Sequence, residues 1–188
     1  MHTARDGNAP TPLPHRQADI PAQTPGATMT GVIEDSPFDG AADVVRGLVS
    51  ADLGRIHLRP RRYGIKVWFG ANEPPREHYE AQVIGADHVA DARMLAIEIG
   101  FHAEHRKVAE NDAVIARLVR AEARWRRVIG HEAVVGGFLG RADDWRRVSE
   151  TWADPDLGDP ELALEIGTRL TDYITAFEPL LEPLLGND

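Results

Sequence analysis

The alternation of apolar and polar residues between Arg55 and His102 limits the possible folds more than any other feature of the chain. Only a β-strand places alternate residues on opposite faces, because the faces of a helix repeat every 3.6 residues. Glycine and proline between the alternating segments favour turns. The pattern therefore predicts four strands of an antiparallel sheet, at Arg55–Arg59, Ile65–Phe69, His78–Ile84 and Met94–His102.

One face of this predicted sheet is apolar and the other is polar. An antiparallel sheet commonly leaves one face to water, so an open polar face needs no function to explain it. Trp68 is the unexpected member, because a large exposed indole usually contacts another group, and we expect it to mark a binding surface. The polar positions are Arg55, His57, Arg59, Lys66, Trp68, His78, Glu80, Gln82, Glu98 and His102.

Three other segments have helical spacing and helix-capping residues. The first begins at the N-cap Ser36 and ends before Gly54, and the second runs from Glu110 or Asn111 to Ile129. The third starts at Asp159 and runs to about Glu178, where Pro179 and Pro183 are expected to end it. We expect the second helix to be the main cover of the apolar face. Two further strands, Ala133–Arg141 and Trp145–Trp152, are predicted as a hairpin.

These elements predict an α+β fold, a two-layer sandwich in which the helices lie on one face of an antiparallel sheet. Residues 36–188 are expected to form this single domain. Residues 1–35 hold five of the thirteen prolines and no hydrophobic periodicity, which predicts a disordered tail.

The order of helix, four strands, helix, two strands and helix resembles that of type III secretion chaperones and YbjN-like proteins. In those proteins a helix, three strands, a helix, two strands and a helix pack in two layers. The resemblance covers residues 36–185, with one additional strand here. It implies a fold and carries no functional residue to this chain.

Composition excludes several classes of function. The chain has no cysteine, so it has no disulfide, thiol nucleophile or cysteine-based zinc site. It has no apolar run long enough to cross a membrane and no signal-peptide pattern at its start, and a cytoplasmic location is expected. The net charge of −9 opposes general binding to nucleic acid or anionic lipid.

The second predicted helix carries a row of arginines on one side. Arg117, Arg120, Arg124 and Arg127 follow one another at intervals of three, four and three. Such a row is most often a solvated helix face, and the alternative is a surface that binds an anion or a partner. Nucleic-acid binding by the segment from Arg117 to Arg147 is a weaker third hypothesis.

The segment from Glu98 to His105 holds the residues best suited to metal binding or acid–base catalysis. Glu98 and His102 are expected to share a strand face with Glu80, and His57 and His78 could extend this group. Two carboxylates and an imidazole can hold a divalent metal ion, or a glutamate can act as a general base. His105 is expected to point to the face opposite His102, because the two are three residues apart on a strand or its end.

Other motifs are absent or incomplete. Asp154, Asp156 and Asp159 lack the spacing of an EF-hand loop and are expected to form a turn and a helix cap. The chain has no phosphate-binding glycine-rich motif, no GxSxG and no HExxH. The sequence therefore identifies no cofactor.

Two hypotheses follow. The leading one is a small acidic non-catalytic domain that binds a protein partner or ligand, as a chaperone-like or regulatory protein, or self-associates. It would use Trp68 and Lys66, or the arginine row. The alternative is a metal-assisted hydrolase or acid–base enzyme with Glu80, Glu98 and His102 as catalytic residues. That alternative requires the three side chains to converge within about 5 Å.

Overall fold

The computed structural model describes residues 36–71, 73–139 and 144–181, and the predicted tail at residues 1–35 lies outside them. The chain divides into Met1–Ile33 and Glu34–Asp188, and the description concerns the second part. Its elements are α1 (Pro37–Leu48), β1 (Ile56–Arg61), β2 (Gly64–Phe69), β3 (Glu77–Gly85), β4 (Leu95–Ala103), α2 (Val108–Arg120), α3 (Glu122–Ile129), β5 (Val134–Gly137), β6 (Arg146–Ala153) and α4 (Leu162–Leu181).

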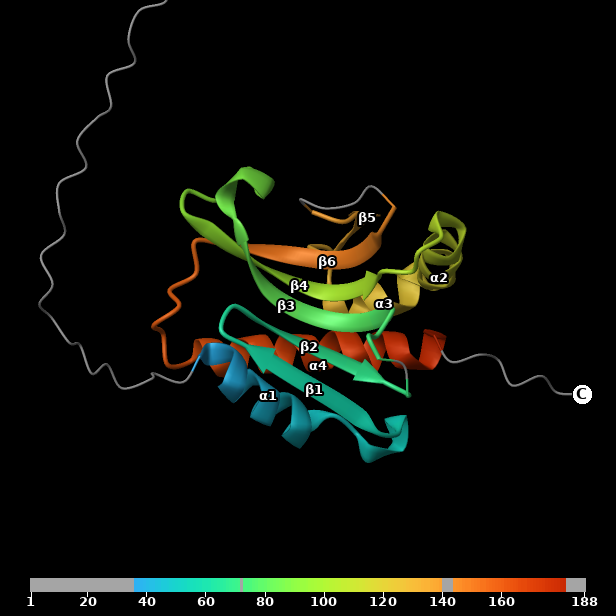
Figure 1. Ribbon diagram of the computed structural model, residues 1–188, viewed down its shortest axis with the longest axis horizontal. Coiled ribbons are helices and arrows are strands. Elements are labelled where there is room, and N and C mark those ends of the chain that lie inside the picture. Colours follow the sequence, from blue (N-terminus) through green and yellow to red (C-terminus); the bar gives the residue numbers. More distant parts are fainter. Residues whose placement is uncertain (1–35, 72, 140–143, 182–188) are drawn as a thin grey trace, which may run out of the picture. The chain divides into compact units, whose positions relative to one another are not determined.

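The six strands form one antiparallel sheet in the order β1-β2-β3-β4-β6-β5 (Figure 1). The four strands predicted between residues 55 and 102 all form, with ends within two residues of the predicted ones. Pro60 lies inside β1, where it is tolerated because β1 is an edge strand and proline has no N–H for a further ladder. The β4–β6 pair brings the end of the alternating segment next to a strand far along the chain.

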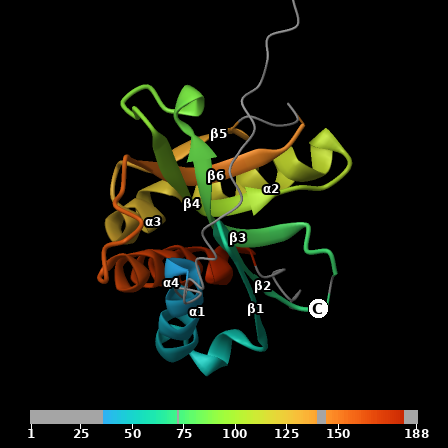
Figure 2. The same cartoon turned by 60° about the vertical axis from the view of Figure 1, so that its left-hand side comes forward.

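All four helices pack on the apolar face, which confirms the predicted α+β class (Figures 1 and 2). Helices α1 and α4 pack against each other and cover β1 to β4, while α2 lies against β4 and β6. The principal cover is therefore α4 and not the second predicted helix. Its inward residues Leu170, Tyr173, Ile174 and Phe177 are all fully buried.

The second predicted helix is wrong as a single element, because it breaks at Ala121 into α2 and α3. Ala121 has φ −105° and ψ 14°, outside the helical range. The carbonyl of Leu118 accepts the backbone N–H of Ala121 at 3.0 Å and also a hydrogen bond of 2.9 Å from the indole N–H of Trp125. Because α3 starts in a new direction after the break, Val128, which was expected in the apolar stripe, is 53% exposed.

Two other predicted boundaries change. Helix α4 continues through Pro179 to Leu181, since a proline so close to the helix end removes only one backbone hydrogen bond. The first strand of the predicted second hairpin was expected at Ala133–Arg141 and is shorter, since β5 spans only Val134–Gly137. Residues 140–143, which the sequence assigned to this hairpin, lie outside the described residues. No helix in the described part of the chain is long and apolar enough to cross a membrane.

Candidate functional site

The polar face of the sheet carries a connected group of charged side chains, most of which are buried. Glu98 and His102 have no exposed surface, and His78 and Glu80 are 1% and 8% exposed. The prediction of an open polar face is therefore wrong. Part of the cover is Phe138, which follows β5 in the chain and whose ring centroid lies 4.6 Å from that of His102.

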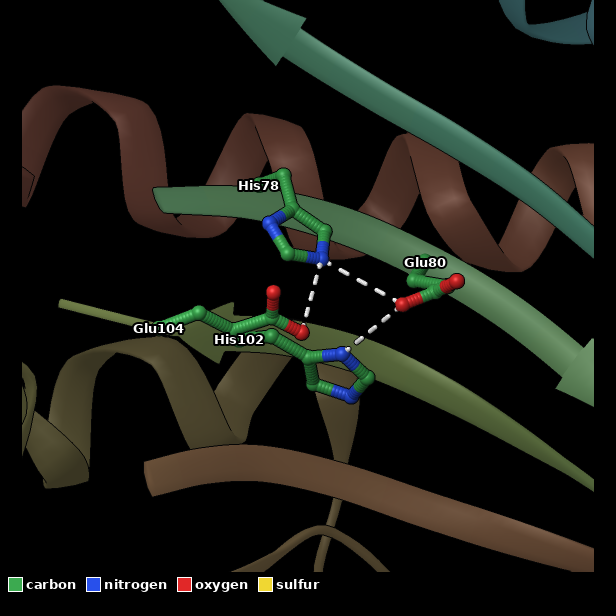
Figure 3. A group of neighbouring side chains, drawn as sticks. All are labelled: His78, Glu80, His102 and Glu104. Carbon is green, nitrogen blue, oxygen red and sulfur yellow. Dashed lines mark hydrogen bonds and ion pairs between the residues drawn. The ribbon is translucent and has the colours of Figure 1, made fainter. Parts of the chain in front are cut away.

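Four of these residues bring metal-binding atom types together (Figure 3). His78 and Glu80 lie on β3, while His102 and Glu104 lie on β4 and directly after it. Each pair is separated by one residue, so its members point to the same face of the sheet. The strand register places His78 opposite His102. We call His78, Glu80, His102 and Glu104 the four-residue centre.

The separations within the four-residue centre are short. One nitrogen or carboxylate oxygen from each residue lies within 4.8 Å of the others. Glu80 Oε2 is 3.3 Å from His78 Nε2 and 3.2 Å from His102 Nδ1. Glu104 Oε1 is 3.7 Å from His78 Nε2. The carboxylate of Glu80 thus joins the two imidazoles, and that of Glu104 approaches from the other side.

Lys66 on β2 supplies a positive charge beside this centre. Its Nζ is 2.9 Å from His78 Nε2, 3.2 Å from Glu80 Oε2 and 3.6 Å from Glu104 Oε1. Nε2 also lies 3.3 Å from Glu80 Oε2, so it donates to that carboxylate if it carries the ring proton, and it accepts from the ammonium if the proton is on Nδ1. That Nδ1 is buried and has no hydrogen-bond partner within the described ranges.

Glu98 holds the other side of the His102 ring. Its Oε1 lies 3.4 Å from His102 Nε2 and accepts a hydrogen bond of 2.7 Å from Ser149 on β6. Its Oε2 accepts one of 3.0 Å from Gln82 on β3, and Arg147 Nε lies 3.6 Å from Oε1. His102 therefore lies between two carboxylates, each fixed by neighbours on other strands.

Gly100 allows β4 and β6 to approach closely at this point. A Cβ atom on Gly100 would lie 2.3 Å from the carbonyl oxygen of Val148 and 2.5 Å from Cβ of Ser149. Any side chain here would force the strands apart. The hydrogen bond between Ser149 and Glu98 depends on that approach.

The neighbours of these groups fix their charges. Burial lowers the pKa of His102, but hydrogen bonds to Glu80 and Glu98 outweigh it and raise the pKa to about 9. Burial opposes ionisation of Glu80 and Glu98, yet hydrogen bonds from the histidines hold both pKa values below the usual range. Burial lowers the pKa of His78, which stays neutral at pH 7.

The formal charges around the centre then balance. Lys66, His102 and Arg147 are positive, and three carboxylates are negative. Buried charges cost least when each is paired and hydrogen-bonded; here each positive group lies within 4 Å of a carboxylate, although Glu104 Oε1 has no hydrogen-bond partner among the described residues. The three carboxylates are those of Glu80, Glu98 and Glu104.

A pocket of about 350 Å³ opens beside the four-residue centre. Lys66, Glu80 and Glu104 are part of its lining, whereas His78 and His102 are not and lie behind them. A molecule in the pocket would therefore meet the two carboxylates before the imidazoles. Other lining residues include Arg59, Arg61, Tyr63, Pro74, Pro75 and Gln82.

The prediction of an exposed Trp68 is wrong. Trp68 is 6% exposed, and its ring stacks on that of His57, its cross-strand neighbour, at a centroid distance of 5.1 Å. The guanidinium of Arg59 lies 5.1 Å from the centroid of the same ring. Residues on β1 thus cover the indole, which the alternation pattern alone could not indicate.

The arginine row divides into two kinds. Arg120, Arg124 and Arg127 are exposed, and none of them forms an ion pair within residues 36–71, 73–139 and 144–181. Arg117 is half-buried, donates a hydrogen bond of 2.9 Å to the carbonyl of Leu181 and so joins α2 to the end of α4. Arg120, Arg124 and Arg127 therefore form an exposed surface, whereas Arg117 has a structural contact.

Of the remaining predicted positions, His105 and Asp159 follow the sequence pattern and Asp154 does not. His105 contacts Glu77 at 2.9 Å, away from the four-residue centre, as expected for the opposite face. The carboxylate of Asp154 accepts hydrogen bonds from the backbone N–H groups of Arg93 and Met94, and Asp159 caps Glu161. Asp159 therefore acts as the predicted cap, whereas Asp154 binds a backbone segment 60 and 61 positions away in the chain instead of a local turn.

The sequence did not lead us to predict Glu104 as a site residue, and His78 was given only as a possible extension of the predicted group. The available signal was the repeated His-x-Glu pattern, His78-Tyr79-Glu80 and His102-Ala103-Glu104, at corresponding ends of two predicted neighbouring strands. Lys66 was predicted only as a residue for binding a partner. Its contacts across β2 and β3 depend on strand order.

Comparison of the chain with protein-family models, with curated proteins and with solved structures gave no match. The function is therefore argued from the geometry of the site. The resemblance to type III secretion chaperones remains one of element order.

Proposed function

We propose that the protein binds a divalent transition-metal ion in the four-residue centre and uses it in a hydrolytic or acid–base reaction on a small molecule in the adjoining pocket. The observation that carries this proposal is the convergence of two imidazole nitrogens and two carboxylate oxygens within 4.8 Å. Imidazole and carboxylate together suit zinc and its neighbours in the first transition row.

The measured separations fit a tetrahedral ion. Four ligands bonded at zinc distances lie about 3.4 Å from one another. Three of the six separations are 3.2, 3.3 and 3.7 Å, and the remaining ones are no longer than 4.8 Å, so the ligand atoms would have to close in by up to about 1.4 Å. Glu104 Oε1 is buried and has no hydrogen-bond partner among the described residues, and it would coordinate the ion.

The surroundings of His102 also suit a ligand. A histidine that binds a metal usually directs its second ring nitrogen to a carboxylate, which fixes the ring and increases its basicity. Glu98 is in that position, with Oε1 3.4 Å from His102 Nε2. Because Glu98 has no exposed surface, we assign it a positioning role and not contact with substrate.

The pocket favours a catalytic site over a structural one. Structural zinc sites are closed, whereas catalytic sites keep a position for water or substrate. Glu80 and Glu104 belong both to the centre and to the pocket lining, so an ion held by them would be near a bound molecule. The metal would polarise the substrate and lower the pKa of bound water.

A second candidate is a ligand-binding domain without metal or chemistry. It is favoured by Lys66, whose ammonium already contacts three groups of the centre and offsets their charge. The burial of Trp68 removes one reason for assigning a protein partner to this face. The two candidates differ in whether an ion binds.

The test is metal content and affinity. Protein stripped with a chelator and reloaded should retain about one zinc, cobalt or manganese ion per chain, measured by elemental analysis and calorimetry. His78→Ala and Glu104→Gln should each weaken binding at least about a hundredfold, since loss of an outer-shell partner already costs 10–100-fold. His131→Ala, at an exposed histidine, is the matched control. Failure of folded wild-type protein to bind any of these ions would overturn the proposal.

A further inference from the structure

We infer that the pocket beside the four-residue centre binds a small anion through a carboxylate or phosphate group, and that metal binding strengthens this by moving Lys66 into the pocket. The inference rests on the proposed metal centre and adds the class of ligand. It depends on the contacts of Lys66, on Arg61 and on the charges that line the pocket.

Lys66 and a metal ion would compete for the same groups. The Lys66 ammonium contacts His78, Glu80 and Glu104, which are three of the four proposed ligands. An ion bonded to these groups would lie beside a second positive charge in a largely buried place, where repulsion is strong. The lysine side chain is flexible and 17% exposed, and it lines the pocket. Metal loading therefore moves the ammonium toward the pocket.

The pocket already contains a cation that has no partner among the residues that the structure describes. Arg61, at the end of β1, is exposed and makes no hydrogen bond or ion pair with any described residue. Arg59, two residues earlier on the same strand, is paired with Glu73. A guanidinium binds carboxylate and phosphate groups in a planar two-point geometry.

The charge of the lining changes when the ion binds. Before loading, the ammonium of Lys66 is offset by Glu80 and Glu104. After loading, both carboxylates are committed to the ion, so Lys66 and Arg61 face the pocket as unpaired cations. A volume of about 350 Å³ accommodates a small molecule. An anionic ligand would restore the balance and contact the ion at its other end.

Calorimetric titration with two probes, acetate and methyl phosphate, distinguishes the two sources of the anion. Each is titrated into metal-free and cobalt-loaded protein. We expect at least one probe to bind about tenfold more tightly to the loaded form, and Arg61→Gln to remove about tenfold of that affinity, as for loss of a charged hydrogen bond. Arg55→Gln is the matched control, because Arg55 is an exposed arginine near the start of β1 outside the pocket lining.

The outcomes separate this inference from the metal proposal. If cobalt binds but neither probe binds more tightly to the loaded protein, the anion inference fails and the metal centre stands. If Arg61→Gln and Arg55→Gln lower the affinity equally, the pocket is not the anion site and the inference fails. If no metal binds at all, the proposed function itself fails, whatever the probes do. Preference for one probe assigns the carboxylate or the phosphate class.

Discussion

His102 Nδ1 lies 3.2 Å from Glu80 Oε2, although the two residues are 22 positions apart in the chain. The contact exists because β3 and β4 pair in a register that places His78 opposite His102, with Glu80 two residues further along the same face. A buried imidazole and a buried carboxylate each make the charged form of the other favourable. This pair is the centre of the charge network on the polar face.

Glu80→Gln should therefore destabilise the fold. The substitution leaves His102 and Lys66 without the carboxylate that both contact, and breaking a buried ion pair costs about 3 kcal/mol or more. The measurement is the free energy of unfolding in urea. Glu73→Gln is the control, because that side chain is 64% exposed in its pair with Arg59 and should cost under about 1 kcal/mol. Equal effects of the two changes would contradict the network.

Stability should depend on pH through His102. Its folded pKa of about 9 lies above the ordinary histidine value of 6.5, so its contribution is complete below pH 6.5 and is lost as pH rises through 9. The shift corresponds to a loss on the order of 3 kcal/mol. Unfolding should be measured in chelator from pH 6 to 10 for wild type and His102→Gln. The difference between the two free energies should shrink toward alkaline pH, and a constant difference would count against this assignment.

Gly100→Ala should separate β4 from β6. The new Cβ would meet the Val148 carbonyl at 2.3 Å, and backbone atoms cannot move aside as a flexible side chain can. We expect a loss of about 2–3 kcal/mol, as for overpacking. Gly47→Ala is the control, because nothing lies within 4 Å of its Cβ position in α1 and alanine favours a helix. A neutral Gly100→Ala would mean that the close approach is not required.

Lys66→Met should tighten metal binding by about tenfold, because it removes a competing cation worth at least one charged hydrogen bond. The stem of methionine fills similar space without the charge. Competition with a chelator of known affinity measures the change. Weaker metal binding by Lys66→Met than by wild type would show that the lysine assists the ion and does not compete with it.

The alternation of side chains predicted a large part of this arrangement. It identified the four strands between residues 55 and 102 and placed Glu80, Glu98 and His102 on one face, because strand periodicity is a local property. It also separated His105 from His102 correctly. Register and strand order then decided which of these residues meet.

The rest depended on long-range packing. Burial of His102 under Phe138 involves a segment that follows β5, and burial of Trp68 under His57 involves a cross-strand stack. The break at Ala121 has no glycine or proline to mark it in the sequence. It is compensated by the hydrogen bond of Trp125 to Leu118, which only the folded helix pair reveals.

The most direct test of the account is anomalous diffraction at the zinc edge from crystals of the protein grown with zinc. We expect one strong peak that marks a zinc ion about 2.0–2.2 Å from each of His78 Nε2, Glu80 Oε2, His102 Nδ1 and Glu104 Oε1. The Lys66 ammonium should have moved away from these atoms. A peak at His105 and Glu77 instead, or density for Lys66 still in contact with Glu80 and no peak between the two histidines, would contradict it.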